Sequence, residues 1–240
     1  GCFDITSGPL SRLWGFHRRQ GELPQPEAIE IALQTVGSQW LVLDSSAETV
    51  QFDKPAMEIN LGSIGKGYAL DRCSSLLEEA RIEDYIMHGG MSSIVARGSR
   101  QLSCNEQPGW HVALRHPLKP GKRLAEICLH NRALGTSGSA NQFFYHQGKR
   151  FGHVIDPRTG HSADEVLSVT VLAPTAALAD ALATAFFVMG KEQAFDYCQQ
   201  HPSVAALFVL PGNLQGSIEI QTWGLSEEDW WPSDLEAGTA

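Results

Sequence analysis

Apolar residues recur at helical spacing in several parts of the chain, and proline or glycine marks the ends of these segments. Pro26 is placed to open a helix that stops at Gly37, and Gly190 is placed to end another. A helical period in the apolar positions indicates a helix with one face against a core. Helices are therefore predicted over 26–36, the second half of 59–82, 177–190 and about 191–200, with a shorter helical turn beginning at Pro9.

Short apolar runs separated by turn residues predict strands between these helices. The most apolar is 167–173, LSVTVLA, whose β-branched content suits a central strand with both faces covered. Further strands are predicted over 40–43, 49–52, 85–88, 93–97, 110–115, 124–130, 143–145 and 204–210. With 240 residues, we expect one large domain.

Composition and charge narrow the class of function. The chain is 42% hydrophobic and 19% charged, with a formal net charge of −9. These values are ordinary for a soluble globular domain. No run of five basic residues occurs, so nucleic acid is not an expected partner. A protein this acidic that binds a polyphosphate must recruit a metal ion, a helix N-terminus or backbone amides.

The five cysteines are odd in number and widely spaced, at positions 2, 73, 104, 128 and 198. No CxxC or mixed His/Cys spacing occurs, so we expect free and mostly buried thiols. No membrane-spanning run and no signal peptide is visible. The chain opens inside a motif, at Gly1-Cys2-Phe3-Asp4, and the sequence leaves open whether the natural protein is longer there.

Asp180 and Thr184 form the first candidate site. They lie four residues apart within a predicted helix, so both side chains face the same way near its start. A carboxylate and a hydroxyl offer two hard oxygen ligands for Mg²⁺. The structural alternative is that Asp180 complements the helix dipole and Thr184 is incidental.

A glycine-rich segment, Asn60-Leu61-Gly62-Ser63-Ile64-Gly65-Lys66-Gly67, precedes the second predicted helix. Its amides could cradle a phosphate, with Lys66 as a cation. It lacks the Walker A pattern, because Gly67 stands where that pattern needs a hydroxyl. The alternative is a glycine-rich turn leading into a helix.

A third segment runs from Gly152 to Gly160, GHVIDPRTG, and follows Gly135-Thr136-Ser137-Gly138. Within it His153 could act as a general base near neutral pH, or could be a hydrogen-bonded structural residue. Arg158 either holds the Asp-Pro-Arg-Thr-Gly turn by pairing with Asp156 or touches phosphate. The Gly89-Gly90 pair alone indicates only a tight bend.

Taken together and in this order, these segments resemble the ApbE family, the FAD:protein FMN transferases. The matching blocks are Phe3-Asp4-Ile5-Thr6-Ser7-Gly8-Pro9-Leu10, Leu13-Trp14-Gly15-Phe16, Leu61-Gly62-Ser63-Ile64-Gly65-Lys66-Gly67-Tyr68-Ala69, Gly89-Gly90, Thr136-Ser137-Gly138, His153-Val154-Ile155-Asp156-Pro157-Arg158-Thr159-Gly160 and Ala179-Asp180-Ala181-Leu182-Ala183-Thr184-Ala185. Each block is weak alone, but their common order along nearly the whole chain is specific.

The resemblance implies an α+β fold, a single domain with a mixed, mostly antiparallel sheet and flanking helices. It places this domain over 1–223, without the family's N-terminal strands, and leaves an acidic tail over 224–240 that we expect to dock loosely or to fray. It implies FAD as substrate, with Mg²⁺ held by Asp180, Thr184 and an oxygen of Ser63. The residues expected to contact FAD are Cys2, Phe3, Asp4, Asn60, Lys66, Gly89, Gly90 and Ser137. His153 is the expected base, so His153 and Asp180 form the expected catalytic pair.

The implied reaction moves FMN from FAD to a Thr or Ser hydroxyl of an acceptor protein and releases AMP. Two alternatives stay open: an FAD pyrophosphatase that yields FMN and AMP, and a protein that binds FAD without turnover. Asn60 replaces an Asp common in the family, and Met91 or Ser92 stands where an Asp commonly follows the glycine pair. The resemblance favours an extracytoplasmic location, with membrane association only through an N-terminal lipid anchor that this sequence does not show.

Overall fold

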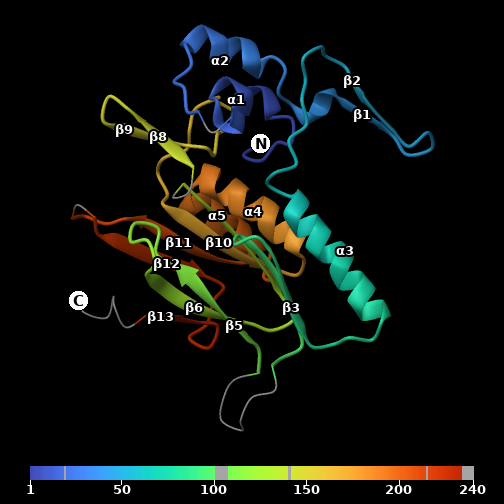
Figure 1. The fold of residues 1–240 in the computed structure, drawn as a ribbon, viewed down its shortest axis with the longest axis vertical. Helices are drawn as coiled ribbons and strands as arrows, with labels where there is room; N and C mark the ends of the chain where they lie inside the picture. The colour runs from blue at the N-terminus through green and yellow to red at the C-terminus, as the bar shows by residue number, and fades with distance from the viewer. Residues whose placement is uncertain (19, 101–107, 140–141, 215, 234–240) are drawn as a thin grey trace. The chain divides into compact units, whose positions relative to one another are not determined.

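The computed structural model describes residues 1–240 apart from 19, 101–107, 140–141, 215 and 234–240. Contacts within the chain divide it into two compact units, described in turn (Figure 1). Unit 1 comprises 1–63 and 139–164, and unit 2 comprises 64–138 and 165–240. Cys104 lies outside the described residues. Among those described, no helix has both the length and the apolar character needed to cross a membrane.

Unit 1 contains short helices, two β-hairpins and a small aromatic core. Trp14, Phe16 and Ile29 are its buried centre, and the Trp14 Nε1–H donates to the carbonyl of Gly160 over 2.8 Å. Phe144 and Phe151 pack against this centre from the second hairpin. The elements are α1 (Gly8–Leu13), η1 (Phe16–Arg18), α2 (Pro26–Leu33), η2 (Ser38–Trp40), β1 (Leu41–Asp44), β2 (Thr49–Phe52), β8 (Phe143–His146) and β9 (Lys149–Gly152).

Unit 2 is built on a six-stranded antiparallel sheet of order β12-β11-β10-β7-β4-β3 and a three-stranded antiparallel sheet of order β13-β6-β5. Its strands are β3 (Tyr85–Gly89), β4 (Ser93–Arg97), β5 (Trp110–Arg115), β6 (Arg123–Leu129), β7 (Ala133–Gly138), β10 (Ser168–Ala173), β11 (Ala205–Pro211), β12 (Ile218–Trp223) and β13 (Trp230–Pro232). Its helices are α3 (Gly65–Glu79), α4 (Ala176–Met189) and α5 (Lys191–Gln200).

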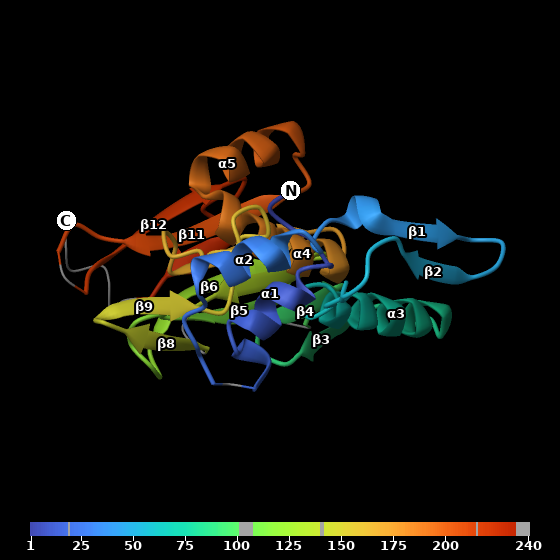
Figure 2. The ribbon, with the colours of Figure 1, turned by 90° about the horizontal axis from the view of Figure 1, so that it is seen from above.

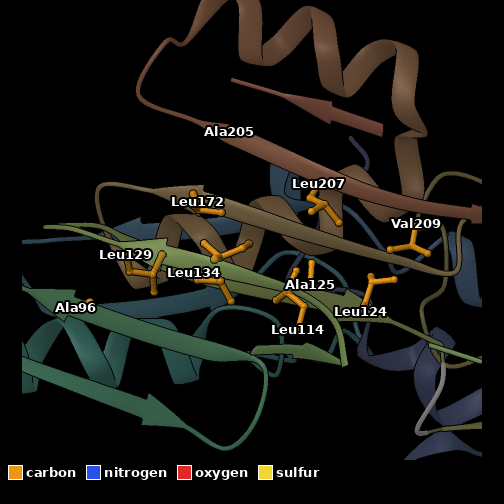
Figure 3. Packing of buried hydrophobic residues seen from close by; sticks show 11 residues of the cluster. Ala96, Leu114, Leu124, Ala125, Leu129, Leu134, Leu172, Ala205, Leu207 and Val209 are labelled. Carbon is orange, nitrogen blue, oxygen red and sulfur yellow. The ribbon is translucent and has the colours of Figure 1, made fainter. Parts of the chain in front are cut away.

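The main core lies between the two sheets of unit 2. Figure 3 shows side chains from both sheets meeting there, including Leu124 and Leu129 of β6 and Leu172 of β10. Because strand side chains alternate between faces, the neighbouring residues of β10 point to the other face of the large sheet. Helix α4 packs on that face over β7 and β10, and α3 packs against α4 (Figure 1). Helix α5 packs against β11 (Figure 2).

Every predicted helix and strand has a counterpart, and the α+β class is confirmed. The helix that begins at Pro26 ends at Leu33, earlier than predicted, because the amides of 34–36 form bonds to carbonyls only three residues back. The expectation of a loosely docked or frayed tail is wrong for Trp230–Pro232, whose backbone pairs with β6. The boundary at residue 223 stays a prediction.

Strand β7 was not predicted, although it lies inside the large sheet between β10 and β4. Its sequence, ALGTSG, has the small and polar composition of a turn. The composition instead serves the packing of α4. A Cβ placed on Gly135 would lie 2.3 Å from the Ala179 carbonyl oxygen, so only glycine allows the helix to approach this closely.

Candidate functional site

The residues singled out from the sequence divide between the two units. Unit 2 carries Lys66, Gly89, Gly90, Ser137, Asp180 and Thr184, and unit 1 carries Cys2, Phe3, Asp4, Asn60, Ser63 and His153.

Asp180 is the most constrained of these residues. Its side chain lies on the second turn of α4 and is only 5% exposed. The Ser93 hydroxyl donates to its Oδ1 over 3.0 Å, and the Gly67 amide donates to its Oδ2 over 3.2 Å. The Lys66 ammonium lies 3.4 Å from the same Oδ2. A buried carboxylate needs such donors to offset its lost hydration, and here three of them converge on it.

The start of α4, one turn before Asp180, is capped from another helix. The two carboxylate oxygens of Asp71, on α3, accept from the amides of Ala176 and Ala177 over 2.7 and 2.8 Å. Thr175 adds the usual N-cap by accepting from the Leu178 amide. Close contact of the two helices depends on Gly67, since a Cβ there would lie 2.1 Å from the Ala176 carbonyl oxygen. Helix α4 and its carboxylate are therefore held from α3.

Thr184 lies one turn beyond Asp180 on α4 and is partly exposed. Their spacing along a continuous helix places the two side chains on one face, as predicted. The residues described here contain no group of three or more His, Cys, Asp or Glu able to hold a metal ion. One carboxylate and one hydroxyl still fit Mg²⁺, which binds few protein ligands and keeps waters or substrate phosphates in its shell.

The remaining unit 2 candidates line the same sheet. Ser137 follows Gly135 by two residues on β7, so both lie on the face that α4 covers. Gly89 ends β3, and Gly90 has a φ of +72°, so the predicted tight bend is confirmed. The structure does not test contact of these three residues with FAD, which stays a prediction.

Asp4 and Asn60, in unit 1, organise their own backbone. The Asp4 carboxylate accepts from the Thr6 amide and hydroxyl through Oδ1 and from the Ser38 amide through Oδ2. Asn60 accepts from the Gly62 backbone amide through its side-chain oxygen, and its backbone amide donates to the Ile5 carbonyl. Asn60 therefore links the opening motif to the glycine-rich segment. Flavin contacts of Cys2, Phe3, Asp4 and Asn60, and a metal contact of Ser63, stay predictions.

The Nδ1 atom of His153 contacts a backbone carbonyl. Its Nδ1 lies 3.2 Å from the carbonyl oxygen of Gln142, which can only accept, so Nδ1 carries the hydrogen. Nε2 is then the basic nitrogen of the neutral ring. The ring packs edge-on to Phe16 at 6.3 Å between centroids.

Arg158 holds the turn that follows His153, which was one of the two predicted alternatives. Its Nε and terminal nitrogen donate to both oxygens of Asp156 over 2.7–3.2 Å, and its amide donates to the same carboxylate. These bonds to Asp156 raise the pKa of the Arg158 guanidinium above its usual value.

Sequence reasoning missed Asp71 and Ser93, the two side chains that fix α4 and its carboxylate. Asp71 follows the glycine-rich segment within the helical pattern, where an acidic residue reads as an ordinary surface position. Ser93 reads as the first residue of a strand. Their partners lie 105 and 87 residues away along the sequence, and no local sequence pattern predicts a contact at that separation.

Comparison with known proteins places the chain in a family. The family model described as "ApbE family" matches residues 1–208. The FAD:protein FMN transferase of Haemophilus influenzae is 34% identical over 89% of this chain, and that of Escherichia coli K12 is 36% identical over 93%. The chain spans about three-fifths of the length of these curated relatives, 62% in both cases.

Solved structures of similar proteins share the fold. The ApbE protein of Thermotoga maritima superposes with a TM-score of 0.78 at 32% identity, over 91% of this chain and 69% of that one. The flavinyl transferase ApbE of Pseudomonas stutzeri, in its apo form, gives 0.77 at 26% identity, over 92% and 67%. From the matched family model and the curated relatives, the resemblance seen in the motifs is confirmed, and the chain belongs to the ApbE family.

Proposed function

We propose that this chain is the FAD-binding part of an FAD:protein FMN transferase that uses Mg²⁺. The observation that carries the proposal is the Asp180 carboxylate, buried at the start of α4 and already facing a cation, the Lys66 ammonium. Because burying a carboxylate without a compensating positive charge is costly, this position favours a bound cation beside Asp180. The names of the relatives supply the reaction class.

Asp180 and Thr184 are the residues of unit 2 that would hold Mg²⁺. The ion would supply charge neutralisation on the diphosphate of FAD, which is the main requirement of phosphoryl-type transfer. Lys66, within reach of Asp180, can also compensate phosphate charge.

In the proposed reaction, a Thr or Ser hydroxyl of the acceptor protein attacks the phosphorus of the FMN half of FAD. The new P–O ester bond forms as the bond to the AMP phosphate breaks, and AMP leaves with the bonding electron pair. The hydroxyl proton goes to a general base. His153 is our assignment for that base, from its motif and from the tautomer that makes Nε2 basic.

The test is product analysis with FAD, Mg²⁺ and an acceptor protein that presents a Thr. We expect AMP together with a covalently flavinylated acceptor. Asp180→Ala should abolish both products, and Asp196→Ala, an exposed acid on α5, should leave them unchanged. His153→Ala should lower the rate by a factor of about 10²–10⁴, the usual contribution of a general base.

Three other results would redirect the proposal. Free FMN and AMP without a labelled acceptor would identify an FAD pyrophosphatase. FAD binding without AMP would identify a non-catalytic flavin-binding protein. Unchanged cleavage in Asp180→Ala would show that the metal assignment is wrong.

A further inference from the structure

Ser93 is a buried hydroxyl whose role neither the motifs nor the family comparison assigns. It is the first residue of β4 and is 0% exposed. Its neighbours across the sheet are Gly89 on β3 and Gly135 on β7. Neither has a side chain, so the Ser93 hydroxyl stands beside two glycines on the sheet and donates to Asp180 Oδ1 over 3.0 Å.

The donors around Asp180 constrain its two oxygens differently. Oδ2 receives the Gly67 amide and faces the Lys66 ammonium. Oδ1 receives the Ser93 hydroxyl over 3.0 Å. Lys66 is a point charge on a flexible stem, and its side chain is 40% exposed. It therefore neutralises the charge of Asp180 but does not fix the orientation of the carboxylate. A short hydroxyl fixed on a strand sets the direction of Oδ1.

We propose that Ser93 is a positioning residue, which orients the Asp180 carboxylate for a divalent cation. The inference rests on the proposed function, because it takes Asp180 as a ligand. Residues that orient a metal-binding carboxylate typically change metal affinity by about 10- to 100-fold when they are removed. The substitution Ser93→Ala removes the donor to Oδ1 and leaves the charge of the site unchanged.

The experiment is a calorimetric titration of Mg²⁺ alone into the 240-residue chain, without FAD. We expect Ser93→Ala to weaken Mg²⁺ binding about tenfold. Ser93→Thr, which keeps a hydroxyl, should recover most of the affinity even if its added methyl lowers the melting temperature. The matched control is Ser74→Ala, which removes another hydroxyl, 3% exposed and bonded to Tyr85, from the same unit. That variant should lose stability and keep its Mg²⁺ affinity.

The outcomes separate this inference from the proposed function. If the wild-type chain binds no Mg²⁺, or if Asp180→Ala binds it equally well, the metal assignment itself fails. If wild type binds and Asp180→Ala does not, an unchanged affinity in Ser93→Ala overturns the role of Ser93 alone. Should Ser93→Ala not fold, Ser93→Cys keeps a side chain of similar shape with a weaker donor. Wild-type affinity in that variant would also overturn the inference.

Discussion

The cap that Asp71 places on α4 yields a prediction that joins stability to the candidate site. Its two oxygens accept from the amides of Ala176 and Ala177 over 2.7 and 2.8 Å, and the Ala176 side of this contact is fully buried. Each hydrogen bond to a charged group contributes about 1.5–3 kcal/mol net. The favourable position of a carboxylate at a helix N-terminus adds about 0.3–1 kcal/mol.

From these values, we expect Asp71→Ala to lower the free energy of unfolding by about 3–7 kcal/mol, since both amides lose their acceptor together. Asp71→Asn keeps one acceptor oxygen and presents an amide nitrogen to the second N–H, so about half of that loss is expected. Asp180 lies four residues beyond Ala176 on the same helix. Fraying of the first turn should therefore also weaken Mg²⁺ binding in both variants.

The assay is urea unfolding followed by far-ultraviolet circular dichroism, with equal m-values required for the comparison. Glu79→Gln is the matched control, because Glu79 is an exposed acid at the end of α3, the helix that also carries Asp71. Its effect should stay within about 0.5 kcal/mol. A loss below about 1 kcal/mol in Asp71→Ala, or an Asp71→Asn variant as stable as wild type, would refute the view that this carboxylate holds α4.

Three further predictions concern packing and ionisation. Gly135→Ala would place a Cβ 2.3 Å from the Ala179 carbonyl oxygen, so urea unfolding should show a loss of at least about 1–3 kcal/mol; a neutral effect would contradict the close approach of α4. Trp14→Phe leaves the buried carbonyl of Gly160 without its hydrogen-bond donor, so the free energy of unfolding in urea should fall by about 1–3 kcal/mol. Wild-type stability in this variant would argue against the 2.8 Å bond. Burial raises the pKa of the Cys198 thiol from 9.0 to about 11, so the folded state holds this proton more tightly than the unfolded state. The contribution of the protonated Cys198 thiol to the free energy of unfolding is complete below pH 9 and falls by at most about 3 kcal/mol as the pH rises towards 11. Cys198→Ala should therefore lose less stability than wild type between pH 9 and pH 11. Parallel curves of unfolding free energy against pH for the two proteins would refute this role of Cys198.

Local patterns predicted the elements well where one residue pattern had one structural meaning. The helix over Ala176–Met189 follows from apolar periodicity and Gly190, and β10 follows from its β-branched run. The prediction failed for β7, because its glycines and serines have the composition of a turn. In the folded chain, the small side chains of β7 instead make room for a helix on one face of the sheet.

The candidate site likewise combines features that local patterns predict with features that only packing determines. Sequence order alone identified the family and placed Lys66 and Asp180 among the candidates, because each belongs to a short motif whose residues are close along the chain. That Lys66 and Asp180 meet was decided by the packing of α3 on α4.

By itself, the sequence determined the family, the main helices and strands, and most of the candidate residues, since all of these follow from patterns that span a few turns or one strand. Only the tertiary structure decided what surrounds Asp180 and what holds its helix. The donors from Gly67 and Ser93 and the cap from Asp71 lie 87 to 113 residues away from their partners. A hydrogen bond depends on positions in space, and positions at such separations are set by how sheets and helices pack, which no local pattern encodes.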